Sequence, residues 1–135
     1  MTSMTGGCLC GRVRYSVTGE PASSYLCHCR DCQRFTGSAF LTGMAFPAAA
    51  VSIQGQLTTY RNTSEAGREV RRLFCPNCGT SVSAEAEIMP GMTIIAVGTL
   101  DNPDDFKPTT DLYWSSAQPW FHSGGERNHF PKMPP

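Results

Sequence analysis

The chain has 135 residues, which is the size of a single domain with a modest hydrophobic core. Eleven basic and eleven acidic side chains cancel, so there is no net charge to attract nucleic acid or anionic lipid. The N-terminus lacks a charged segment followed by an apolar one, and the longest run of small apolar residues, 45–51, contains Pro47 and is too short to span a bilayer. We therefore expect a cytoplasmic protein that binds neither nucleic acid nor membranes.

Seven cysteines form three groups along the chain: Cys8 and Cys10; Cys27, Cys29 and Cys32; Cys75 and Cys78. An odd number of clustered cysteines in a reducing compartment favours metal binding over disulfides. Structural zinc has four protein ligands, whereas catalytic zinc has three and an open position. Seven cysteines therefore divide into one closed site of four and one open site of three.

Residues 6–11 are expected to be a flexible entry into a strand, because Val13, Tyr15 and Val17 then alternate with polar residues. If the entry is extended, Cys8 and Cys10 lie on the same face and can bind one ion. Taken alone, this pair is read equally well as two small buried hydrophobic residues.

The second pair, Cys75 and Cys78, forms a Cys-x-x-Cys motif followed by Gly79, which suits a zinc knuckle. A thioredoxin-like redox motif is the alternative, but that motif normally opens a helix, and here strand-like sequence lies on both sides. We expect this pair to complete a closed structural zinc site with Cys8 and Cys10.

The stretch 27–32 places three thiols within six residues and is the predicted catalytic site. A short helical turn over 30–35, stopped at Gly37, can bring Cys32 back to an ion held by Cys27 and Cys29. His28 then faces away, and we expect it to be hydrogen-bonded behind the site. The alternative is a structural four-ligand site completed by His28 or by a distant residue such as His122 or His129.

The rest of the sequence predicts a mainly β domain with a few short helical turns. Expected strands cover 38–46, 51–53, 56–60, 69–74, 80–87 and 92–97, with 80–87 exposed and 92–97 buried on both faces. A helical or loop interruption is expected at 47–50, and a helical turn is expected to be capped by Asp104 and Asp105. The aromatic residues of 111–121 should cover the core, and 122–135 should be an irregular tail.

Three arginines, Arg68, Arg71 and Arg72, precede the knuckle. A solvated strand face explains them best, and a cradle for a carboxylate-bearing substrate is the alternative.

Four stretches form a recognisable set: Gly-Cys-Leu-Cys-Gly at 7–11, the stretch from Cys27 through Gly37-Ser38-Ala39-Phe40, and the segments 74–79 and 98–101. As a set, they resemble the glutathione-dependent formaldehyde-activating enzyme (GFA) family, which includes centromere protein V. The resemblance covers 6–121. It implies one GFA-type domain over 1–135 with a zinc-stabilised β-tent fold. It also implies two zinc ions, a structural one at Cys8, Cys10, Cys75 and Cys78, and a labile catalytic one at Cys27, Cys29 and Cys32.

The implied activity is that of a carbon–sulfur lyase, which joins formaldehyde to glutathione to give S-hydroxymethylglutathione. An ion with three thiolate ligands can take a substrate thiol as its fourth ligand, so the expected partner is a small thiol such as glutathione. Arg34 or the arginines at 68, 71 and 72 could receive its carboxylates, and His28, Asp31 or Asp111 could carry the proton. A non-enzymatic zinc-binding interaction module, or a thiol or metal sensor, is the alternative function.

Overall fold

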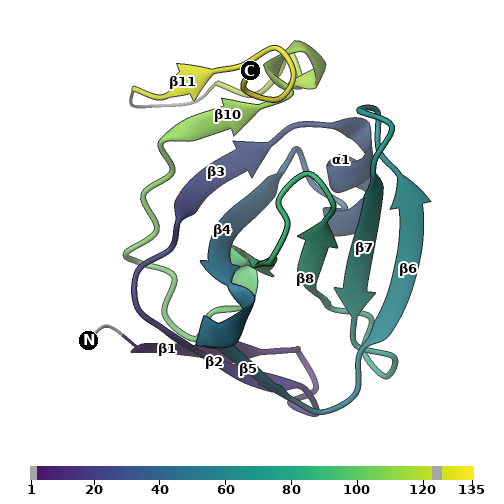
Figure 1. The fold of residues 1–135 in the computed structure, drawn as a ribbon, viewed down its shortest axis with the longest axis vertical. Helices are drawn as coiled ribbons and strands as arrows, with labels where there is room; N and C mark the ends of the chain where they lie inside the picture. Colours follow the sequence, from purple (N-terminus) through teal and green to yellow (C-terminus); the bar gives the residue numbers. More distant parts are fainter. Residues whose placement is uncertain (1–2, 123–125) are drawn as a thin grey trace.

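The computed structural model describes residues 3–122 and 126–135, which form two β-sheets with one short α-helix, as the sequence predicted for a mainly β protein. The smaller sheet has the antiparallel order β1-β2-β5, and its strands are β1 (Ser3–Gly7), β2 (Arg14–Thr18) and β5 (Val51–Gln54). It lies across one end of the molecule, beneath the strands of the larger sheet (Figure 1).

The larger sheet has the order β11-β10-β3-β4-β9-β8-β7-β6. Neighbouring strands are antiparallel from β3 to β6, whereas β10 pairs in parallel with both β3 and β11. The strands are β3 (Ser23–Cys27), β4 (Leu41–Pro47), β6 (Thr58–Thr63), β7 (Glu69–Phe74), β8 (Ser81–Ala86), β9 (Met92–Ala96), β10 (Thr110–Leu112) and β11 (Asn128–His129).

Helix α1 (Arg30–Thr36) lies at the end of the molecule opposite the smaller sheet, beside the turn between β6 and β7 (Figure 1). It ends as predicted, because Gly37 has a φ of 69°, a left-handed conformation that favours glycine. The described residues also contain three short 3-10 turns, at Ala48–Ala50, Val97–Thr99 and Trp114–Ser116.

The hydrophobic core has two parts. One lies between the sheets, where Val13, Val17, Phe46, Val82 and Ile95 are fully buried. The apolar side chains of the predicted alternation in β2 therefore face this core, and β9 is buried from Thr93 to Ala96, in line with the prediction. The second part includes Cys27 and Cys32 and borders a cavity.

Four expectations were wrong in detail. Residues 6–11 are not a simple flexible entry, because β1 forms through Gly7 and Cys10 lies in a turn. Strand β8 is largely buried, because Val82 packs in one part of the core and Ala84 and Ala86 pack in the other. Asp104 and Asp105 form a turn without a helix, and the tail predicted to be irregular contains β11, which pairs with β10.

Candidate metal centres and the adjoining cavity

The four cysteines predicted to form the closed site lie together. Cys8 follows β1, Cys10 is in the next turn, and Cys75 and Cys78 lie in the turn between β7 and β8. Their Sγ atoms are all within 4.8 Å of one another, with 3.6 Å between Cys8 and Cys10 and 3.8 Å between Cys10 and Cys75. Tetrahedral zinc with Zn–S bonds of about 2.3 Å requires sulfurs about 3.8 Å apart. The cluster therefore fits a zinc ion.

Hydrogen-bond donors surround these sulfurs. The backbone N–H of Val13 donates to Cys8 Sγ at 3.2 Å, and that of Asn77 donates to Cys75 Sγ at 3.4 Å. Thr80 Oγ1 lies 3.2 Å from Cys78 Sγ, and its hydrogen bond is the main reason that the pKa of Cys78 falls to about 5. The thioredoxin-like alternative required a helix after Cys78, whereas the chain turns at Gly79 and enters β8.

The three cysteines of the predicted catalytic site also lie together. Cys27 ends β3, Cys29 is the N-cap residue of α1, and Cys32 lies in the first turn of that helix. Their sulfurs are within 4.8 Å of one another, so this cluster too could hold a metal ion. Among the residues that the structure describes, no histidine or carboxylate joins the three cysteines, so the predicted four-ligand alternative finds no fourth protein ligand there.

Arg72 supplies a buried positive charge to this cluster. Its side chain reaches from β7, and Nη1 lies 3.6 Å from Cys32 Sγ. The Nε of Arg72 donates to Asn62 Oδ1 at 3.0 Å, and its guanidinium lies over the ring of Phe35. The expectation that Arg72 belongs to a solvated face was wrong, since the residue is only 6% exposed.

The other two arginines of this segment do fit a solvated strand face. Arg71 pairs with Glu69 at 2.9 Å and with Glu85 at 3.4 Å, and Arg68 lies 3.9 Å from Glu87. Adjacent residues of a strand point to opposite faces, so Arg71 points away from the face that carries Arg72.

The three thiols differ in acidity. Hydrogen bonds from the Cys27 and Cys32 thiols, together with the charge of Arg72, hold the pKa of Cys29 well below its usual range. The pKa of Cys27 is raised, first because its thiol donates to Cys29 and then because it is buried. Cys29 is therefore the first of the three to become a thiolate.

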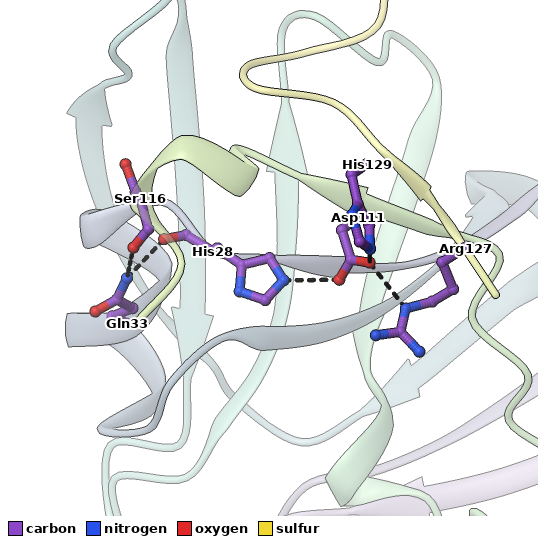
Figure 2. A network of polar contacts seen from close by, with 6 residues as sticks. All are labelled: His28, Gln33, Asp111, Ser116, Arg127 and His129. Carbon is purple, nitrogen blue, oxygen red and sulfur yellow. Dashed lines mark hydrogen bonds and ion pairs between the residues drawn. The ribbon is translucent and has the colours of Figure 1, made fainter. Parts of the chain in front are cut away.

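A buried polar network begins at His28, which lies between Cys27 and Cys29 in the sequence (Figure 2). The fully buried His28 has its Nε2 2.7 Å from Oδ1 of Asp111. Asp111 also accepts from Nε of Arg127 at 2.9 Å and lies 3.2 Å from Nε2 of His129. His28 therefore occupies the supporting position predicted for it, and His129 is engaged with Asp111. The network itself was not predicted, because its members are separated by up to about a hundred residues of sequence.

Backbone contacts extend this support to the cysteine loop. Gln33 Nε2 donates to the carbonyl oxygens of His28 and Ser116 at 2.6 and 3.0 Å (Figure 2). The N–H of His28 donates to Leu112 O at 2.9 Å. These bonds fix the backbone between Cys27 and Cys29 against α1 and β10.

The aromatic residues of 111–121 act mainly as a cover, as expected. Trp114, Phe121 and Phe40 surround the His28 ring, with centroids 5.1, 5.9 and 5.4 Å from it. Trp120 is an exception because it is 66% exposed.

A cavity of about 180 Å³ lies beside the three cysteines. All three cysteines line it, together with Arg72, Asp31 and mostly apolar side chains from the larger sheet. Neither His28 nor Asp111 is among its lining residues, so of the three predicted proton carriers only Asp31 reaches it. Arg30 also lines it and was not predicted to do so.

The chain matches the model of the glutathione-dependent formaldehyde-activating enzyme family over residues 3–116. It belongs to this GFA family. A crystal structure of a Rhodobacter sphaeroides protein is similar in fold, with a TM-score of 0.59 and 24% sequence identity over 76% of this chain and 94% of that one. No curated protein matches this chain.

The GFA match ends at Ser116, so the last part of the chain lies outside it. The described portion of this tail nevertheless packs onto the family domain: Phe130 N donates to Asp111 O at 2.9 Å, and Met133 lines the cavity beside the cysteines. Within 3–122 and 126–135, none of the helices has the length and apolar character needed to traverse a bilayer.

Proposed function

We propose that this GFA protein is a zinc-dependent carbon–sulfur lyase that binds a small thiol at Cys27, Cys29 and Cys32 and joins it to an aldehyde. Glutathione is the first candidate thiol, and formaldehyde is the aldehyde of the reaction for which the family is named. The observation that supports this most is the cluster of three sulfurs on the wall of a cavity, with no fourth protein ligand among the described residues.

A zinc ion held by these cysteines would offer its fourth position to the substrate thiol and lower the pKa of that thiol. Arg72 is placed to balance the negative charge of the cluster, because its guanidinium contacts Cys32 and is buried. A thiolate ligand adds one further negative charge, so a buried cation at this point favours a thiolate over a neutral ligand.

The covalent step is an addition. The thiol sulfur forms a bond to the carbonyl carbon, the π electrons of the C=O bond move to oxygen, and that oxygen takes up the proton that the thiol has lost. Asp31 lines the cavity and accepts a hydrogen bond from Asn62 Nδ2 at 3.1 Å, so it is the proposed carrier of this proton.

The carboxylates of glutathione need cationic partners. Arg72 lines the cavity and also a neighbouring hollow, which Arg34 lines as well. We assign the carboxylates of glutathione to this hollow. Arg68 and Arg71 instead form ion pairs with glutamates on the exposed face.

The four-cysteine cluster is proposed to be a closed structural zinc site. It joins the turn after β1 to the turn between β7 and β8, and Cys10 and Cys75 are 65 residues apart in sequence. A metal that links such distant segments offsets part of the chain entropy lost on folding.

The test is a titration of zinc-loaded protein with glutathione and with S-methylglutathione, which lacks the free thiol, followed by addition of formaldehyde. We expect glutathione to bind at least tenfold more tightly than the methylated compound, and the adduct to form faster than without protein. Equal binding of the two compounds would contradict the site assignment. Thiol-selective binding without any acceleration would reject the enzyme and favour a thiol or metal sensor.

A further inference from the structure

The cavity beside the three cysteines is much larger than formaldehyde requires. It has a volume of about 180 Å³, whereas a water molecule needs only about 10–15 Å³ of such space, and an apolar protein cavity of about 150 Å³ can hold benzene. Formaldehyde has only two heavy atoms and would leave most of the cavity unfilled.

Most of the wall of the cavity is apolar. Tyr25 of β3, Leu41 of β4, Val70 of β7, Ile94 of β9 and Leu112 of β10 all face it. The space exists because β8 presents only methyl groups here, from Ala84 and Ala86. Such a surface favours an apolar ligand, because burying hydrocarbon removes it from water.

The charged side chains along the cavity are already engaged by protein groups. Arg30 donates to Gln33, Asp31 accepts from Asn62, Arg72 binds Asn62 and Cys32, and Glu65 binds Lys132. A charged ligand group inside the cavity would have to compete with these contacts or remain unpaired among mostly apolar side chains, and both are unfavourable. The cavity therefore suits an uncharged group.

The tail beyond the GFA match supplies one wall. Met133 lines the cavity and is half-buried, and the neighbouring Lys132 binds Glu65 in the turn between β6 and β7 at 2.5 Å. This ion pair joins the tail to a turn that also lines the cavity. Met133 is thus held where it limits the size of a ligand.

We propose that the carbonyl substrate is an apolar aldehyde whose hydrocarbon part is about the size of a benzene ring or a branched five-carbon chain. This rests on the proposed function, in which a thiol adds to a carbonyl at the three cysteines. The hydrocarbon part fills the cavity with its carbonyl carbon toward the cysteines. The thiol and the aldehyde combine into a hemithioacetal with no other reactant, because the thiol proton ends on the carbonyl oxygen. Met133 is a specificity-determining residue for this aldehyde.

The first experiment observes the cavity without any reaction. Zinc-loaded protein carrying ¹³C in its methionine methyl groups is titrated with benzyl alcohol, with methanol as a small polar control. Benzyl alcohol should shift the methyl signals of Met89 and Met133, which line the cavity. The signals of Met4 and Met44, which lie elsewhere, should not change. Unchanged Met89 and Met133 signals, or equal shifts at all four methionines, would overturn the proposal.

The second experiment compares the factors by which the protein accelerates the addition of 3-methylbutanal and of formaldehyde to glutathione, each measured against its own uncatalysed rate. We expect the larger aldehyde to be preferred by about tenfold or more, because even one methylene in a fitted apolar pocket changes specificity by such a factor. Met133→Trp should reduce this preference, and Pro135→Trp, which introduces the same side chain at an exposed position of the same tail, should keep it. Equal use of both aldehydes, or the same preference in Met133→Trp, would overturn the proposal.

The failure of the aldehyde assignment can be distinguished from the failure of the proposed function. If glutathione binds selectively and methionine signals do not respond to benzyl alcohol, the aldehyde assignment is wrong and the proposed thiol site stands. If glutathione fails to bind at the metal, the proposed function is wrong, and the aldehyde assignment is overturned with it whatever the methionine signals do.

Discussion

Nε2 of His28 lies 2.7 Å from Oδ1 of Asp111, and neither side chain is exposed to solvent. The two residues are 83 positions apart. Asp111 also binds Arg127 and His129, so one buried carboxylate joins the loop between Cys27 and Cys29 to β10 and to the tail. The three-cysteine cluster is therefore supported by a polar network that does not itself reach the cavity.

Replacing Asp111 by Ala should lower the free energy of unfolding by about 3–5 kcal/mol, because it removes the buried carboxylate to which His28 and Arg127 donate. The measurement is urea denaturation in the presence of zinc. Asp105→Ala, at an exposed position, is the matched control and should change stability by less than about 0.5 kcal/mol. Similar losses in the two variants would show that the network contributes little.

Cys78→Ser should abolish cooperative unfolding or give insoluble protein, because Cys78 belongs to the cluster that joins the turn after β1 to the turn between β7 and β8. Metal analysis and denaturation of the purified variant check this. Cys29→Ser is the matched control, since it removes a thiol from the other cluster and should preserve the fold while lowering metal content. A folded Cys78→Ser protein with full metal content would refute the closed site.

The sequence identified the elements whose pattern is local. Alternation from Val13 to Val17 predicted β2, the apolar run 92–97 predicted β9, and Gly37 predicted the end of α1. Cysteine spacing grouped the metal-ligand candidates correctly, because the local turns at 27–32 and 75–78 place the sulfurs within each motif.

Tertiary contacts determine the features of burial and polar pairing that the sequence pattern did not predict. Arg71 and Arg72 are adjacent and chemically alike, and only the packing of Asn62 and Phe35 beneath one of them makes Arg72 the buried one. The small and polar residues of β8 suggested exposure, but Val82, Ala84 and Ala86 of this strand pack in the core. The role of Asp111 depends on Arg127 and His129, which sequence spacing does not connect to it.

Stability should fall at alkaline pH because of Tyr15. Burial raises the pKa of Tyr15 to about 12, and its hydroxyl lies 2.7 Å from Thr99 Oγ1. An unfolded tyrosine titrates near pH 10, so between about pH 10 and 12 the unfolded chain loses a proton that the folded protein retains. The free energy of unfolding therefore decreases as the pH rises through this interval.

Tyr15→Phe should remove part of this alkaline decrease, whereas Tyr60→Phe, at a position 63% exposed, should leave it unchanged. Urea denaturation at a series of pH values from 8 to 11.5 measures the slopes. Parallel curves for the wild type and Tyr15→Phe would show that another group causes the decrease.

Arg72→Met should weaken zinc binding at the three-cysteine cluster and, with it, the binding of a thiolate ligand. The guanidinium contacts Cys32 Sγ at 3.6 Å in a buried position, and removing one partner of such a charge pair costs about 2 kcal/mol or more, which corresponds to about thirtyfold in affinity. Competition with a chelator measures the metal affinity, and the glutathione titration measures the thiol.

The control for this change is Arg71→Met, which removes an equal charge from the adjacent residue of the same strand. Arg71 binds Glu69 and Glu85 on the exposed face, so its loss should alter zinc affinity less than threefold. Arg72→Lys should retain part of the affinity, because the charge is kept while the contact with Asn62 is altered. If Arg72→Met and Arg71→Met bound zinc equally well, the buried guanidinium would have no electrostatic role at the cluster, and its contacts with Asn62 and Phe35 would be structural.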